Sequence, residues 1–132
     1  MSEGFAPGST RDRGARAESY VVELARERGL TVLARNVEAA GVEIDIVAKQ
    51  PGQPDIYVFI EVRSRADNAR GRPVETVGPA KQARLIKGAT AWLVDEGLWE
   101  RVQVRFDVVG VTWPDEQAPE IEWIAGAFEV DG

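Results

Sequence analysis

Asp45 and Glu61 are the two residues of this chain whose type and spacing best suit chemistry. Each is a carboxylate with apolar residues directly before and after it, and fifteen residues lie between them. A divalent cation held between two carboxylates can activate water and neutralise charge on a phosphodiester during hydrolysis. The chain contains no histidine and no cysteine, so any metal must be held by oxygen, which favours Mg²⁺ or Mn²⁺.

Two further charged residues, Glu43 and Arg63, lie two positions from this pair. A turn at residues 52–53 places Asp45 opposite Glu61, with β-carbons roughly 4.5–5.5 Å apart. The same register places Glu43 opposite Arg63. The facing carboxylates would repel each other by on the order of 1–3 kcal/mol, and a bound cation would remove that repulsion. Alternatively, Arg63 forms exposed cross-strand ion pairs with Glu43 and Asp45, and the hairpin alone does not decide between the two interpretations.

A β-hairpin must position these residues. The segments Val42–Lys49 and Asp55–Arg65 alternate with period two on either side of Pro51-Gly52-Gln53-Pro54, which is typical of two antiparallel strands and their turn. Alternate residues of a strand point to opposite faces of a sheet. We therefore expect one continuous apolar face, covered by a helix and formed by Ile44, Ile46, Ala48, Ile56, Val58, Ile60 and Val62.

The rest of the chain supplies two helices and three more strands. Apolar residues recur at helical spacing over about residues 13–28, and Gly29 follows as a stop. The other expected elements are a second helix from Pro79 to Gly97 and strands at Leu30–Val37, Arg101–Thr112 and Glu120–Ala125. The order αβββαββ predicts one α/β domain over residues 13–130, preceded by a disordered tail over residues 1–12.

The net charge of −6 is unevenly distributed. Residues 61–87 carry seven basic and three acidic side chains, whereas residues 88–132 carry two and ten. The basic stretch is a candidate surface for phosphate groups, although solvated charges that bind nothing explain the same counts. No segment reaches the ~20 apolar residues that span a bilayer, and the N-terminus lacks the apolar core of a signal peptide. We therefore expect a cytoplasmic protein with no membrane partner.

The two hairpin segments read Gly41-Val42-Glu43-Ile44-Asp45-Ile46-Val47-Ala48 and Val58-Phe59-Ile60-Glu61-Val62-Arg63-Ser64-Arg65. They resemble the motifs G-G-E-I-D-L-I-A and F-V-E-V-K-x-R of the YraN-type endonuclease family. The similarity extends from about Gly14 to Phe128 and includes Glu18, Lys81 and the segment 106–109. That family is assigned by fold to the PD-(D/E)XK nuclease superfamily and is similar to archaeal Holliday-junction resolvases.

The resemblance implies a restriction-endonuclease-like fold, with a mixed central sheet of about five strands flanked by helices, and a Mg²⁺ or Mn²⁺ cofactor. It makes Asp45 and Glu61 metal ligands, together with the backbone carbonyl of Val62 and with Glu18 from the first helix. From the residues alone, Glu18 is equally well a solvated helix charge. Glu43 also matches the family motif at the catalytic site, but its most physical role is to pair with Arg63.

Arg63 departs from the family pattern, because it stands where the family has its catalytic lysine. A lysine can position or deprotonate the attacking water, whereas an arginine stays protonated and cannot act as a base. Arg63 could still stabilise charge on the phosphate. Lys81 could instead supply the ammonium from the second helix, or it is a surface lysine of that helix's first turn. Val42 and Ala17 are smaller departures, at positions where the family usually has glycine.

The expected DNA-contacting surface surrounds this site. Its candidate residues are Arg65, Asn68, Arg70, Arg72, Lys81, Arg84 and Lys87. The leading hypothesis is a metal-dependent DNA endonuclease that hydrolyses phosphodiester bonds, with branched or flapped DNA as a candidate substrate. The alternative, favoured by Arg63, is a non-catalytic nucleic-acid-binding or assembly module with a degenerate nuclease site. By analogy with the resolvases the chain could form a homodimer. Asp107, flanked by apolar residues, is expected to be structural.

Overall fold

The computed structural model describes residues 10–65, 72–113 and 118–129 of the chain. Its elements follow the order that the sequence predicts, with one short 3₁₀ helix added before the second α-helix. They are α1 (Thr10–Glu27), β1 (Thr31–Ala39), β2 (Val42–Gln50), β3 (Ile56–Arg65), η1 (Pro73–Thr76), α2 (Pro79–Asp95), β4 (Gln103–Thr112) and β5 (Glu120–Phe128).

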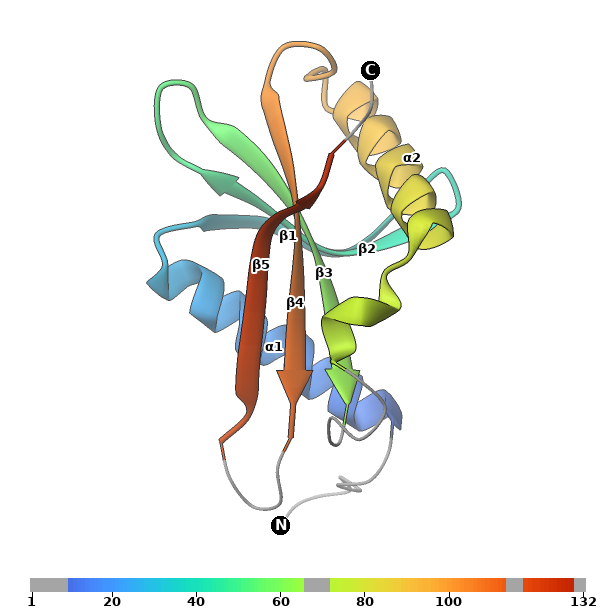
Figure 1. Cartoon of the computed structure of the whole chain (residues 1–132). Helices are drawn as coiled ribbons and strands as arrows, with labels where there is room; N and C mark the ends of the chain where they lie inside the picture. The colour runs from blue at the N-terminus through green and yellow to red at the C-terminus, as the bar shows by residue number, and fades with distance from the viewer. Residues whose placement is uncertain (1–9, 66–71, 114–117, 130–132) are drawn as a thin grey trace.

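The five strands form one mixed sheet in the order β1-β2-β3-β4-β5. β3 and β4 are parallel, and the other neighbours are antiparallel. A parallel pair needs a crossover connection, which the chain makes through η1 and α2. Figure 1 shows α1 behind the sheet and α2 on its right. This mixed five-stranded sheet with flanking helices confirms the predicted α/β class and is consistent with a restriction-endonuclease-like fold.

The two faces of the sheet form separate cores, because side chains alternate along β3. Val58 and Ile60 pack with Val21 of α1, whereas Phe59 packs with Leu93 of α2. Each helix therefore buries one apolar stripe and leaves its other side to solvent. In the described part of the chain, neither helix is long and apolar enough to cross a membrane.

Several element boundaries differ from the prediction by two or three residues. α1 begins at Thr10 rather than at residue 13, because residues 10–12 are polar and apolar periodicity could not mark the first turn. Part of the predicted disordered tail is therefore helical, while residues 1–9 lie outside the described residues. β1 continues to Ala39 and turns tightly into β2 at Ala40 and Gly41, which both have a positive φ.

β2 belongs to two ladders along only part of its length. It pairs with β1 from Val42 to Lys49, but with β3 only from Ile46 onward, in the register that the sequence predicts. Beyond the pair Ile46↔Ile60 the two strands separate, and we call this opening the fork. Asp45 and Glu61 are the first residues of the fork on β2 and β3.

The prediction of one continuous apolar face is wrong at Ile44. Ile44 packs into the core under α2, whereas Ile46, two residues later, packs into the core under α1. Across from Asp45 in the ladder with β1, Asn36 has a left-handed φ of 51°. At this point the side chains of the two strands no longer alternate regularly between the faces of the sheet. The start of β2 thus changes the face that it presents at Asp45, where the fork begins, and we call this change of face the kink.

Candidate functional site

The fork brings Asp45 and Glu61 together, as the hairpin register predicts. Asp45 is 9% exposed and Glu61 is 5% exposed. Because the ladder between β2 and β3 has ended here, the backbone N–H of Val62 donates to Asp45 Oδ2 at 2.8 Å. A carboxylate oxygen thus takes the place of a main-chain partner, which fixes Asp45 beside Glu61.

The pKa of Asp45 is raised from 3.8 to about 8. Burial is the main cause, and the negative charge of Glu61 adds to it, whereas the hydrogen bond from Val62 acts in the opposite direction. Without a cation at the fork, Asp45 therefore keeps a proton to a higher pH than a free aspartate does. Strongly shifted pKa values gather at functional sites, which makes the fork the leading candidate in this fold.

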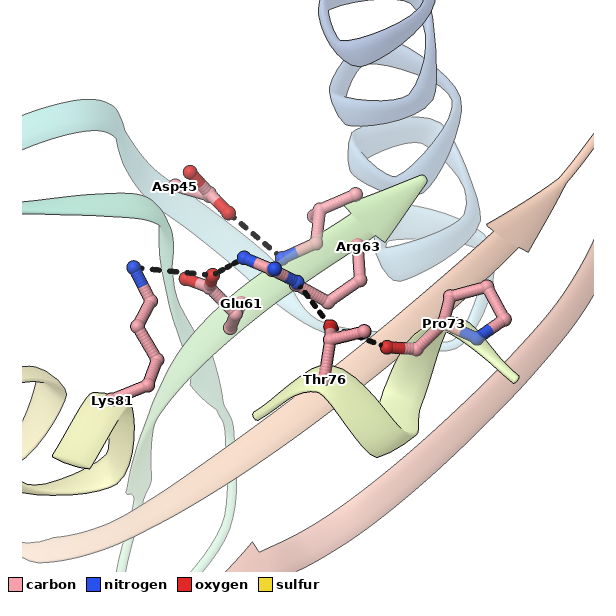
Figure 2. A network of polar contacts seen from close by, with 7 residues as sticks. Asp45, Glu61, Arg63, Pro73, Thr76 and Lys81 are labelled. Carbon is pink, nitrogen blue, oxygen red and sulfur yellow. Dashed lines mark hydrogen bonds and ion pairs between the residues drawn. The ribbon is translucent and has the colours of Figure 1, made fainter. Parts of the chain in front are cut away.

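Two cationic side chains hold Glu61. Arg63 Nη1 lies 3.1 Å and Lys81 Nζ lies 3.5 Å from Glu61 Oε2. Figure 2 shows that they come from different elements, Arg63 from β3 and Lys81 from the start of α2. The side chain of Lys81 is 29% exposed and contacts Glu61, so it is not a freely solvated lysine.

Arg63 also joins the fork to η1. Its Nε donates a hydrogen bond to Thr76 Oγ1 at 2.7 Å, and Thr76 Oγ1 donates to the carbonyl oxygen of Pro73 at 2.7 Å. The guanidinium therefore links Glu61 on the sheet to the segment that leads into α2.

The predicted pairs of Arg63 with Glu43 and Asp45 are wrong. The kink turns the residues on either side of Glu43 toward α2, so Glu43 itself points to the opposite face from Arg63. Burial raises the pKa of Glu18, a hydrogen bond with Asn36 opposes this rise, and the negative charge of Glu43 on the same face adds to it. Glu18 also interacts electrostatically with Asp45, so α1 brings a third carboxylate near the fork, and its expected role as a metal ligand stays a prediction.

Asp45 and Glu61 offer two neighbouring carboxylates, a donor set that suits a hard divalent cation. Within the described ranges, no group of three or more acidic side chains is arranged to hold a metal ion. A pair is sufficient for Mg²⁺, which proteins commonly bind through one or two carboxylates plus substrate phosphates. The carbonyl of Val62, which the family resemblance implies as a further oxygen ligand, stays a prediction. The donor set of the fork is thus entirely oxygen.

The predicted nucleic-acid-binding residues fall into separate groups. Lys81 contacts the fork, as described above. Arg72 forms ion pairs with Glu75 and Glu122, which tie η1 to β5. Two residues, Asn68 and Arg70, lie outside the described residues. The exposed or half-buried remainder consists of Arg65 at the end of β3 and of Arg84 and Lys87 on α2.

Asn36 and Thr76 are site residues that the sequence did not reveal. Asparagine tolerates the left-handed conformation better than most residues, so Asn36 inside a strand was a weak signal for a kink. Nothing in the sequence distinguishes Thr76 from other loop threonines. Its role depends on η1 packing against β4, where Gly110 leaves room for Pro73 and Val74.

Asp107 is a buried carboxylate of a different kind. Its oxygens accept hydrogen bonds from Arg105 Nε at 2.9 Å, Trp123 Nε1 at 2.9 Å and the backbone N–H of Gly126 at 3.0 Å. These bonds connect β4 to β5 where the register of the two strands shifts. Asp107 is therefore structural, as expected.

The model of the uncharacterised protein family UPF0102 matches residues 17–111, a range that contains every residue of the fork. The chain belongs to this family. It is 40% identical to a UPF0102 protein of Anaeromyxobacter dehalogenans, over 90% of this chain and 85% of the relative. It is 41% identical to one of Desulforapulum autotrophicum, over 89% and 93% of the two chains. For one of Pseudomonas aeruginosa the identity is 38%, over 92% and 95%. UPF0102 is the YraN family, so the resemblance of the hairpin motifs is confirmed.

Proposed function

We propose that this UPF0102 protein is a Mg²⁺- or Mn²⁺-dependent endonuclease that hydrolyses phosphodiester bonds in DNA. The observation that carries the proposal is the pair of buried, adjacent carboxylates Asp45 and Glu61, with the pKa of Asp45 raised to about 8. Keeping two such groups together is unfavourable when both are charged. A divalent cation would offset that cost, which gives the arrangement a chemical purpose.

Each residue at the fork has a distinct part in this proposal. Asp45, Glu61 and the carbonyl of Val62 would hold the cation, and Glu18 would add negative charge beside Asp45 from α1. When bound, the cation supplies a water of lowered pKa and Lewis acidity toward the phosphate. Arg63 and Lys81 place positive charge beside Glu61. This charge would attract the phosphodiester and stabilise the negative charge that develops on it during hydrolysis.

A metal titration followed by cleavage assays tests the proposal. Calorimetry with Mn²⁺ compares the wild type with Asp45→Asn, which keeps the shape of the side chain and an acceptor for the Val62 N–H. The resemblance to resolvases makes flapped and four-way DNA the first substrates to compare with linear DNA. We expect the wild type to bind Mn²⁺ and cleave at least one of them, and the variant to lose both properties. A wild type that does not bind millimolar Mn²⁺ would contradict the proposal.

A second candidate function is nucleic-acid binding without cleavage. It is favoured by Arg63, whose guanidinium is engaged by Thr76 and Glu61 at the position of the family's catalytic lysine. The same assays distinguish the two functions, because a binding module would retain DNA affinity and release no product in Mn²⁺.

A further inference from the structure

Two cations meet the same oxygen of Glu61, but the structure holds them differently. Arg63 is fixed at two points, with Nη1 3.1 Å from Glu61 Oε2 and Nε 2.7 Å from Thr76 Oγ1. Lys81 has a flexible side chain, whose Nζ lies 3.5 Å from the same oxygen. Arg63 therefore acts as a fixed link, whereas the ammonium of Lys81 can move toward a ligand.

The link made by Arg63 requires a guanidinium. Thr76 belongs to η1, which is seated closely on β4: a Cβ at Gly110 would lie 3.1 Å from Val74 and 3.2 Å from Pro73. With η1 fixed in this way, one side chain must donate to Thr76 and to Glu61 at the same time. The planar fork of an arginine has donors on separate nitrogens, whereas a lysine has one compact donor group. This geometry accounts for Arg63 at the motif position.

The position of Lys81 is not explained by helix stability. It lies in the first turn of α2, where the helix dipole disfavours a cation and no acidic residue of that turn compensates it. Its side chain is 29% exposed, so its ammonium touches the fork and is still accessible to a ligand. A compact, mobile ammonium beside a carboxylate pair is the group that the motif position itself lacks.

We propose that Lys81 contacts the scissile phosphate, and that Arg63 is a positioning residue that ties Glu61 to η1. This inference rests on the proposed nuclease function. It assigns charge and position at the fork to two residues on different elements.

Substitution of Lys81 tests the first half, and Lys49 offers a matched control. Lys49 is also a partly exposed lysine, 31% exposed, and its Nζ lies 3.8 Å from Asp55 Oδ2 at the turn end of the hairpin. We expect Lys81→Gln to lower kcat for Mn²⁺-dependent cleavage roughly 100-fold, as for loss of one group that stabilises transition-state charge. Its Mn²⁺ affinity should stay equal or rise, because a neighbouring positive charge has been removed. Lys49→Gln should behave like the wild type, and an unchanged kcat for Lys81→Gln would overturn the assignment.

Substitution of Thr76 tests the positioning half without changing any charge. Thr76→Val removes the acceptor of Arg63 Nε, whereas Thr76→Ser keeps it. If Arg63 positions Glu61 through this bond, Thr76→Val should weaken Mn²⁺ binding roughly 10- to 100-fold, and Thr76→Ser should retain wild-type affinity. Equal Mn²⁺ affinity of the two variants would overturn the positioning role, whatever happens to their thermal midpoints.

Failure of the nuclease function itself would be recognised separately. In that case the wild type neither binds Mn²⁺ nor cleaves DNA. The contact of Lys81 with phosphate is then measured by fluorescence anisotropy of metal-free protein with labelled DNA at low salt. Weaker binding by Lys81→Gln than by Lys49→Gln supports the contact, and equal binding overturns it.

Discussion

At the scale of single residues, Asp45 makes stability depend on pH. Its pKa is raised from 3.8 to about 8 in the folded protein, so the folded state binds this proton more tightly than the unfolded state. The stability that the proton provides is complete below a pH of about 3.8 and is lost as the pH rises through about 8. Asp45→Asn removes this titration. We therefore expect the variant to be more stable than the wild type at about pH 9 in chelator, with a difference that vanishes toward pH 4. Urea unfolding across this range measures it.

The response to Mn²⁺ provides the control for this prediction. A ligand that binds the folded state stabilises it by mass action, so millimolar Mn²⁺ should raise the midpoint of the wild type and leave that of Asp45→Asn nearly unchanged. If Asp45 served in an ion pair, the substitution would instead cost up to ~1 kcal/mol with or without metal. A variant that is less stable in chelator and gains as much from Mn²⁺ as the wild type would contradict the metal site.

The sequence predicts which carboxylates meet, but not all of their partners. Asp45 and Glu61 follow from the position of the turn and from the alternation of strand residues, which are both local properties. The partner of Arg63 depends on where η1 packs, and that is set by Gly110 on a strand more than thirty residues further along the chain. The predicted pairing of Glu43 with Arg63 is wrong because β2 changes face at Asp45, beside the left-handed Asn36 of the neighbouring strand.

At the scale of elements, the close packing of α2 on β2 gives a test of the fork's support. A Cβ added at Gly88 of α2 would lie 2.9 Å from the Cβ of Val42, at the start of β2. Overpacking of this kind costs roughly 1–3 kcal/mol, which outweighs the gain in helix propensity of at most about 1 kcal/mol. We expect Gly88→Ala to lower the free energy of unfolding and, by displacing the start of β2, to weaken Mn²⁺ binding.

Gly14 in α1 offers the matched control for Gly88. A Cβ at Gly14 would meet nothing within 4 Å, so Gly14→Ala should gain up to about 1 kcal/mol from helix propensity alone. Urea unfolding of the two variants compares the same substitution in two helices. If both variants were more stable than the wild type, α2 and β2 could move apart at Val42 without cost. That result would contradict the rigid support of the fork by α2.

The order of elements and the hairpin register could be predicted, because both follow from periodicity and turn residues. The kink in β2 could not, since it coincides with a left-handed φ at Asn36 in the neighbouring strand, which the sequence signals only weakly. The parallel pairing of β3 with β4 was also not specified by local pattern. It depends on the crossover through η1 and α2, whose geometry is set by packing against the whole sheet.

At the scale of the whole molecule, the charge is segregated along the chain. The net charge is −6, yet residues 61–87 are basic, and this stretch includes the end of β3, η1 and the first half of α2, which surround the fork. The acidic residues gather in the part that follows, from residue 88 onward. Composition alone argues against nucleic acid, whereas the distribution of charge along the fold places positive potential beside the carboxylate pair. A DNA surface, if the proposed function holds, must therefore be local and strongly dependent on salt.

Reversing two charges on α2 tests this surface. Arg84 and Lys87 are exposed on the helix that carries Lys81, and contacts with phosphate release counterions from DNA. We expect the double variant Arg84→Glu and Lys87→Glu to weaken binding equally for all DNA sequences. The slope of log affinity against log salt should fall by about 0.9 for each lost contact. The control is Arg101→Glu, which reverses the charge of an exposed residue beyond the end of α2. Arg72 is a poorer target because its ion pairs with Glu75 and Glu122 hold η1, so reversal would also disturb the fold. Affinity and salt slope that match those of the Arg101→Glu control would show that DNA does not bind along α2.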